Sequence, residues 1–218
     1  TFAYQNTVGD DLWQALEDAS GQPVLKLMNQ WIAQPGVPLV SATQDKNKLT
    51  LTQKRFFIGE HSPDSTIWPI PVFASQPGAG PILDKSEQSY ETDGPVILNK
   101  NLSAHFVTQY DDISRQKILK LATEGSLETL DKIALLQDIP LLARAGLLSS
   151  AELLPLAQTF SHEVNEKVYT MAMMALSELR KFTDSEPELK TKLKQISRDI
   201  AWPVHQKLGW DEVDGESD

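Results

Sequence analysis

The sequence predicts an α+β, multi-domain fold in which a short helix pair precedes an antiparallel β-sandwich and an α-helical, αα-repeat-like domain. Three observations predict it. Apolar residues recur at helical spacing as far as Ala33. Short segments rich in β-branched and aromatic residues come next, separated by Gly, Pro, Asn and Asp. Helical spacing returns at Asp111, so we divide the chain into residues 1–36, 37–110 and 111–218.

Two helices are predicted within residues 10–33, joined by a turn at Gly21. The second helix must end at Gln34, because Pro35 disfavours helical dihedrals in the residue before it and Gly36 permits a tight exit. The apolar positions of the two helices are Leu12, Trp13, Leu16, Val24, Leu27, Met28, Trp31 and Ile32.

The middle segment is predicted to form short strands. Leu49 and Leu51 alternate with threonines, so one face of their strand should point into the core and the other to water. Pro69 and Pro71 cannot donate to a ladder, which places their strand at an edge or a bulge. Residues 76–81 have the composition of a loop. The predicted strands are 39–43, 49–52, 56–58, 67–73, 96–98 and 104–110.

Helices are predicted again after Asp111. Gly146 should close a short helix over residues 141–145. Ser149 and Glu152 have the spacing of a capping box, so a further helix should begin there. The residues that share buried faces in this stretch are predicted to be Ile118, Leu121, Ala122, Leu127, Leu130, Ala134, Leu135, Leu141, Leu142 and Ala145.

A long helix is predicted over residues 161–182, and a last one from Glu186, kinked at Pro203. Short antiparallel helices of this kind bury their faces only against neighbours. Residues 211–218 are acidic and self-repelling, which predicts a disordered tail. The predicted buried stripes are Val164, Val168, Met171, Ala175, Leu179 and Phe182, and then Leu189, Leu193, Ile196 and Ile200.

Charge and composition exclude several partners. The net charge is -10, so the long-range field repels phosphate backbones and anionic lipid, and we expect neither a nucleic-acid nor a membrane partner. No apolar run is long enough to span a bilayer, and the first residues lack the pattern of a signal peptide. The absence of cysteine fits a reducing compartment, which favours a cytoplasmic protein. A first residue other than Met suggests a chain cut from something longer.

The segment 161–167 offers the strongest hint of a metal site. A zinc hydrolase helix carries His, Glu and a second His one turn after the first, so that both imidazoles face one metal. Here His162 and Glu163 are followed by Glu166 at the position of the second His, and no third ligand is nearby in the sequence. We therefore interpret His162 and Glu163 as first-turn residues of a surface helix and predict no metal ligands in this chain.

No catalytic arrangement is recognisable in the sequence. His61, His105 and His205 are scattered along the chain, and no Gly-x-Ser-x-Gly elbow presents a nucleophile. Gly78 and Gly80 lack the Lys and the following helix of a phosphate-binding loop. We predict no catalytic residue, and the sequence leaves the substrate-binding residues undetermined.

Five tryptophans could in principle form a ligand-stacking surface. Trp13 and Trp31 lie on apolar helix stripes and are better interpreted as core residues. Trp68, Trp202 and Trp210 form no recognisable pattern with them. A sandwich fold by itself licenses no ligand-binding function.

Several stretches resemble a known family. They are residues 6–16, Ala19-Ser20-Gly21, Gln34-Pro35-Gly36-Val37-Pro38 and residues 51–57, with weaker collinear similarity at Trp68-Pro69-Ile70-Pro71, 101–111, 138–140 and 144–148. In order, spacing and residue type they resemble the end of the catalytic domain and the adjoining C-terminal domains in zinc aminopeptidases of the aminopeptidase N family. The resemblance implies that 1–36 are terminal helices of a thermolysin-like catalytic domain, 37–110 a β-sandwich domain, and 111–218 the start of a C-terminal helical domain with an acidic tail.

The departure from the family is equally informative. Family members bind zinc through His-Glu-x-x-His with a downstream Glu, and hold the substrate amine with Gly-x-Met-Glu-Asn; neither motif occurs in these 218 residues. The resemblance therefore implies a noncatalytic C-terminal portion of an enzyme that removes N-terminal residues from peptides, a portion that scaffolds the active site and limits substrate access.

The same resemblance implies partners. Zinc and peptide substrates are expected in the full-length parent, and the remainder of the parent catalytic domain is the expected partner of this chain. With that remainder absent, the exposed first helix should promote self-association. The alternative is a free-standing adaptor or interaction module with no enzymatic role.

Overall fold

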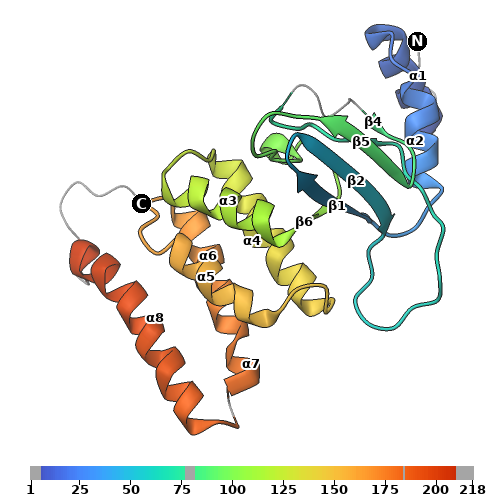
Figure 1. The fold of residues 1–218 in the computed structure, drawn as a ribbon. Helices are drawn as coiled ribbons and strands as arrows, with labels where there is room; N and C mark the ends of the chain where they lie inside the picture. The colour runs from blue at the N-terminus through green and yellow to red at the C-terminus, as the bar shows by residue number, and fades with distance from the viewer. Residues whose placement is uncertain (1–5, 77–81, 184, 210–218) are drawn as a thin grey trace.

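The computed structural model describes residues 6–76, 82–183 and 185–209, and arranges them as a helix pair, a sheet and a group of helices (Figure 1). The helix pair is α1 (Gly9–Ser20) and α2 (Val24–Ile32), which confirms the two predicted helices. Gly21 ends α1 in the left-handed conformation at φ 66°, and its N–H donates to the carbonyl of Glu17 at 2.8 Å.

Side chains of α2 and of the residues just after it attach the helix pair to the sheet part of the molecule. Trp31 Nε1 donates to the carbonyl of Pro69 at 3.0 Å, and Gln34 Nε2 donates to the carbonyl of Ile67 at 3.2 Å. The Trp31 ring lies 6.2 Å, centroid to centroid, from the ring of Trp68. The packing of α2 therefore depends on the segment that precedes β3.

The main sheet has four strands in the order β5-β2-β1-β6. β1 pairs antiparallel with β2, and β2 with β5, but β1 and β6 are parallel, with Leu39 opposite Val107. The prediction of an antiparallel arrangement is thus wrong at β6, which the chain reaches by a long excursion rather than a hairpin. A second sheet contains only β3 and β4. The strands are β1 (Pro38–Asp45), β2 (Lys48–Arg55), β3 (Ile70–Pro71), β4 (Ile82–Leu83), β5 (Glu87–Glu91) and β6 (Val107–Tyr110).

Several predicted strands are shorter than expected or absent from the ladders of the described residues. Residues 56–58 and 96–98 lie outside the strands, and only Ile70–Pro71 of 67–73 belongs to one. Pro69 and Pro71 have no N–H to donate, which limits the ladder on that segment. The predicted loop 76–81 falls outside the described residues from position 77 on.

The sheet core is built on the side chains that alternate inward along β2. Leu49 and Leu51 are buried, as predicted, and Gln53 continues the same face. Its amide donates to the carbonyls of Trp68 at 2.8 Å and Leu83 at 3.1 Å and accepts the N–H of Trp68 at 2.9 Å. A buried polar side chain thus replaces the ladder bonds missing between β2 and the proline-rich segment.

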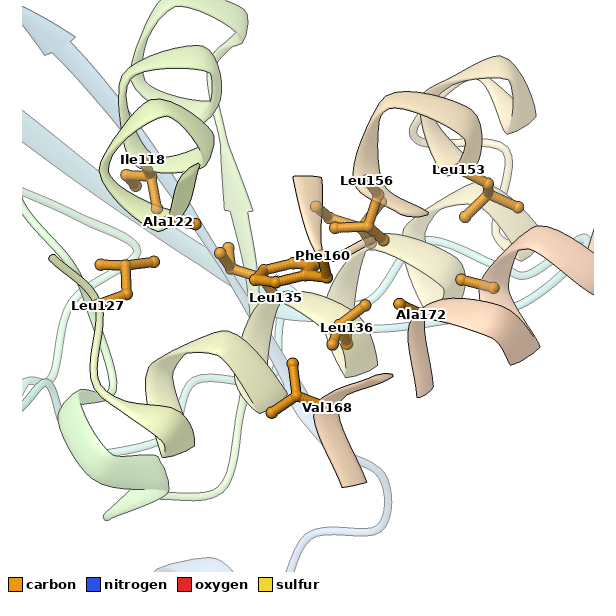
Figure 2. Close-up of a cluster of buried hydrophobic side chains, with 12 residues drawn as sticks. Ile118, Ala122, Leu127, Leu135, Leu136, Leu153, Leu156, Phe160, Val168 and Ala172 are labelled. Carbon is orange, nitrogen blue, oxygen red and sulfur yellow. The ribbon is translucent and has the colours of Figure 1, made fainter. Parts of the chain in front are cut away.

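The third part is helical. Its central side chain is Phe160, which is buried among Leu135, Leu156 and their neighbours (Figure 2). Other helices contribute apolar faces to this cluster or to the smaller cluster of Ala157, Leu176, Leu193 and Ile200. The helices are α3 (Asp112–Thr123), α4 (Thr129–Arg144), α5 (Leu153–Thr159), α6 (Glu166–Glu178), α7 (Arg180–Thr183) and α8 (Pro187–Leu208), with 3-10 turns η1 (Lys100–Leu102) and η2 (Ser150–Glu152).

One predicted helix boundary in the first half of this part is wrong, and one predicted cap is only half formed. α4 runs without a break through Pro140, so the short helix predicted over 141–145 is its last turn, and Leu130 is exposed. Ser149 does cap η2, accepting the N–H of Ala151 at 3.3 Å. Glu152 completes no reciprocal box; it forms an ion pair with Arg115 at 3.1 Å instead.

The second half differs in a similar way. α6 begins at Glu166 rather than at 161, because Asn165 caps it by accepting the N–H of Val168 at 3.2 Å. Val164, predicted in the buried stripe, therefore precedes the helix and is 84% exposed, and Phe182 is exposed on α7. α8 includes Pro203 within its length, and Leu189 on it is exposed whereas Leu193 and Ile200 are buried. The acidic residues 211–218 lie outside the described residues.

Candidate functional site

Three aspartates connect the sheet to the helices by accepting backbone N–H groups from the sheet part. The first is Asp111, which precedes α3. Its carboxylate accepts the N–H of Gln44 on β1 at 2.8 Å and the N–H of Ser114 at 2.8 Å. Burial alone would raise the pKa of Asp111, but the hydrogen bonds from Ser114 and Gln44 outweigh it and lower that pKa. The carboxylate therefore caps α3 and holds it on β1.

The second is Asp131 on α4, which is only 2% exposed. Its carboxylate forms an ion pair with Lys100 and accepts the N–H of Asn101 at 3.0 Å. Both partners belong to η1, whose backbone is unusual: Asn101 and Leu102 in it have φ of 59° and 53°, and Asn99, which precedes it, has φ of 55°. Left-handed dihedrals are costly at a bulky apolar residue such as Leu102, so the turn needs the support that Asp131 provides.

The third is Asp138, two turns farther along α4. Its Oδ2 accepts the N–H of Thr108 on β6 at 2.9 Å. Burial raises the pKa of Asp138 to about 7, and the hydrogen bonds from Thr108 oppose that rise only in part. The Tyr110 hydroxyl accepts the N–H of Leu98 at 2.9 Å, and burial raises the pKa of Tyr110 as well. We name Asp111, Asp131 and Asp138 the aspartate joint.

A cleft of about 630 Å³ opens beside this joint, between the segment before β6, α4 and α6. Its walls are mostly apolar, and include Phe106, Leu141 and Met171. Asp138 and His105 are among its polar side chains. A cleft of this size and composition can hold one apolar side chain of a ligand or partner, with a carboxyl group to orient it.

An ion pair bridges two of the helices that line this cleft. Arg144 Nη2 on α4 lies 2.7 Å from Glu178 Oε1 on α6, and Lys181 contacts the same carboxylate at 3.1 Å. Hydrogen bonds from Arg144 and then Lys181 lower the pKa of Glu178. The pair fixes the spacing of α4 and α6 rather than offering a reactive group, because its charges already neutralise each other.

The predicted first-turn residues His162 and Glu163 lie in the turn between α5 and α6, before the helix, so that interpretation is wrong in detail. Glu163 Oε2 lies 2.6 Å from Lys132 Nζ, and Oε1 accepts the N–H of Val164 at 2.9 Å. Burial opposes ionisation, but the bond from Lys132 outweighs it and lowers the pKa of Glu163. Glu163 therefore ties the turn to α4, while His162 is exposed.

Metal binding finds no support in the part of the chain that the structure describes. Within it, no three His, Cys, Asp or Glu side chains lie close enough together to hold an ion. The described residues therefore do not fit the zinc that the family resemblance leads one to expect, and a zinc site would need ligands from elsewhere.

The other histidines are not brought together. His61 stacks on Phe57 in the loop after β2, with ring centroids 4.1 Å apart. His105 lines the cleft, and the ring of His205 lies 5.3 Å from that of Trp202 on α8.

The described tryptophans do not share one surface. Trp68 is fully buried in the sheet core with Trp31 packed against it, so the core interpretation holds for Trp31. Trp13 on α1 packs against none of the core clusters of the described residues, so its assignment to a core is wrong. Trp202 is 53% exposed on α8. Trp210, Gly78 and Gly80 lie outside the described residues.

The aspartate joint was missed by reasoning from the sequence. The available signal was the spacing of Asp131 and Asp138, which places two carboxylates seven residues apart on one side of α4, in line with buried Leu135 and Leu142. Carboxylates within an apolar stripe need partners, and those partners lie on a distant strand and turn.

No helix in the described residues combines the length and apolar character needed to cross a bilayer.

The chain is similar in sequence to a known family and to several known proteins. Residues 95–218 match the sequence model of the family described as the ERAP1-like C-terminal domain. The chain is 33% identical over 224 residues to aminopeptidase N of Lactococcus lactis subsp. lactis, covering 98% of this chain and 26% of that protein. It is 34% identical to aminopeptidase N of Lactobacillus helveticus, with 99% and 26% covered. It is 31% identical to the alanine/arginine aminopeptidase of Saccharomyces cerevisiae, with 96% and 25% covered. The chain thus spans about a quarter of the length of these curated relatives.

Proposed function

The chain belongs to the ERAP1-like C-terminal domain family, and on that premise we propose that it is a noncatalytic C-terminal portion of a zinc-dependent aminopeptidase that removes N-terminal residues from peptides. The observation that carries the proposal is the similarity to aminopeptidases along 98% of this chain but only 26% of the relative. Zinc belongs, in this proposal, to the rest of the parent enzyme.

The role we assign to this portion is to scaffold the active site and to limit which peptides reach it. The aspartate joint supports a scaffold, because each carboxylate fixes a helix to the sheet part through a buried or partly buried hydrogen bond. A rigid connection keeps the helical part in one position relative to the sheet part, and so relative to the rest of the parent enzyme in this proposal.

The partner we propose is the remainder of the parent catalytic domain, with α1 as the contact. Leu12 and Leu16 on α1 are 55% and 45% exposed, and Val8 before it is exposed too. Apolar side chains clustered on one helix are commonly covered by another part of a protein. The lack of cysteine supports a cytoplasmic location for the parent.

A chimera tests the proposal. The region of Lactococcus lactis aminopeptidase N that aligns with this chain is replaced by the present 218 residues, and hydrolysis of aminoacyl anilides and of peptides of graded length is measured. The chimera should bind zinc and cleave, with an altered preference for peptide length. The isolated chain and the relative without its C-terminal region serve as controls, and both should be inactive.

Three results would contradict the proposal in different ways. Cleavage by the isolated chain with stoichiometric zinc would show that these residues hold a catalytic centre. A chimera that folds and binds zinc but cleaves nothing would favour the adaptor alternative. An unchanged length preference in an active chimera would retain the scaffold role and remove the role in substrate access.

A further inference from the structure

A hollow of about 590 Å³ lies between α7 and α8, and most of the side chains that line it are positively charged. Arg180 contributes from α7, and Lys190, Lys194 and Arg198 contribute from α8. We call it the α7–α8 hollow. In Figure 1 these two helices form a hairpin at the end of the molecule away from the sheet. The hollow is therefore separate from the cleft beside the aspartate joint.

The charge of this hollow is opposite to that of the chain. The chain carries a net charge of -10, yet the described lining of the hollow contains cationic, hydroxyl and apolar side chains only. Arg180, Lys194 and Arg198 are exposed, and none of them forms an ion pair with a described carboxylate. Three cations that face one hollow and form no ion pair among the described residues create a local positive potential that favours anions.

The spacing of two of these cations on α8 adds to the preference for an anion. Lys194 and Arg198 are four residues apart, a spacing at which like charges on a helix repel each other. A bound anion would relieve the repulsion between these two side chains.

The other lining residues define which chemical groups can bind. The hydroxyls of Ser197 and Thr183 donate to the carbonyls of Leu193 at 2.8 Å and Arg180 at 3.3 Å, so their protons are already used. The donors left for a ligand are therefore the guanidinium groups of Arg180 and Arg198 and the ammonium group of Lys194, which pair best with phosphate or carboxylate oxygens. Buried Leu193 supplies an apolar surface beneath them.

We propose that the α7–α8 hollow binds a small polyvalent anion that carries two or more phosphate or carboxylate groups. The volume is within the range of small-molecule sites. The cations come from two helices, so a ligand with several anionic groups can engage both at once, which a single monovalent anion cannot. The site does not depend on the proposed peptidase function.

The test is calorimetric titration of the 218-residue chain with pyrophosphate and, separately, with citrate at low salt. Binding is expected with at least one probe, and Lys194→Gln and Arg198→Gln should each weaken it by about tenfold, as expected for the loss of one charge-assisted hydrogen bond. The tighter probe identifies the preferred group, phosphate or carboxylate. Because both side chains are exposed, both variants should keep the circular dichroism spectrum of the parent chain.

Lys192→Gln is the matched control, since Lys192 is exposed on the same helix but does not line the hollow. It should bind both probes as the unmodified chain does. Absence of binding by pyrophosphate and by citrate would overturn the proposal. So would an equal loss of affinity in Lys192→Gln, which would show general charge attraction rather than a site.

Discussion

Asp138 on α4 accepts the backbone N–H of Thr108 on β6 at 2.9 Å, across a separation of 30 residues. Asp131, on the same side of the helix, does the same for Asn101 at 3.0 Å. The side chains of Asp131 and Asp138 therefore bind the backbone of the sheet part and fix its position relative to α4. Substitutions at either aspartate, or at its partners, should change the stability of the whole chain.

Replacement of Asp138 by Asn should change how stability depends on pH. Burial raises the pKa of Asp138 to about 7 in the folded protein, whereas an unfolded aspartate titrates near pH 3.9. Between these values the folded state binds more protons than the unfolded state, so this group's contribution to stability is complete below about pH 4 and is lost as the pH rises towards 7. Asp138→Asn removes that loss, because an amide cannot ionise.

The measurement is urea unfolding at several pH values. Relative to the unmodified chain, Asp138→Asn should gain roughly 2–4 kcal/mol of unfolding free energy between pH 4 and pH 8. Its side-chain oxygen can still accept the Thr108 N–H. The control is Asp93→Asn, at an exposed loop position, which should show a flat difference. A flat difference for Asp138→Asn would mean that its carboxyl titrates as an ordinary one.

Lys100→Met should destabilise the protein by about 3 kcal/mol, because it leaves the buried carboxylate of Asp131 without its counter-ion. Chemical denaturation measures the loss. The double variant Lys100→Met, Asp131→Asn should recover part of it, since no uncompensated charge then stays buried. Losses that simply add would show that the two side chains are not coupled.

Much of the fold could be predicted from local pattern. Alternation along β2 places Leu49 and Leu51 in the core, and glycine and proline mark the ends of α1 and α2. Local pattern fails where a helix cap or a distant partner determines where an element begins or which side chains are buried. Val164 continues a helical stripe in the sequence, but the Asn165 cap starts α6 only after it and leaves Val164 exposed.

The candidate site was harder to predict, because its partners are distant in the sequence. The role of Asp138 depends on the N–H of Thr108, and the parallel pairing of β6 with β1 brings that strand to α4. Neither the pairing direction nor the partner is visible in a single sequence. The prediction of a separate short helix over residues 141–145 obscured the continuity of α4, which places Asp131 and Asp138 on one side.

Trp31→Ala should destabilise the protein by roughly 2–3 kcal/mol, less than the roughly 3–5 kcal/mol typical of a fully buried aromatic, because the Trp31 ring is only partly buried. The substitution removes contact with Trp68 and the hydrogen bond to the carbonyl of Pro69. Trp31→Phe keeps an aromatic ring and should lose only about 1 kcal/mol, the worth of the hydrogen bond. Thermal or urea unfolding distinguishes the two variants. An unchanged stability in Trp31→Ala would mean that the contact of Trp31 with the sheet core does not stabilise the protein.

The exposed face of α1 should make the isolated chain self-associate. Leu12 and Leu16 lie four residues apart on one side of a helix whose residues are all at least partly exposed, so two copies can bury these side chains against each other. Sedimentation velocity over a range of concentrations should show a dimer or larger species. The double variant Leu12→Gln, Leu16→Gln should not form that species. Gln14→Ala, at an exposed position of the same helix, is the matched control and should associate as the unmodified chain does. A chain that stays monomeric at high concentration, with or without the substitutions, would show that this face is not a contact surface between copies.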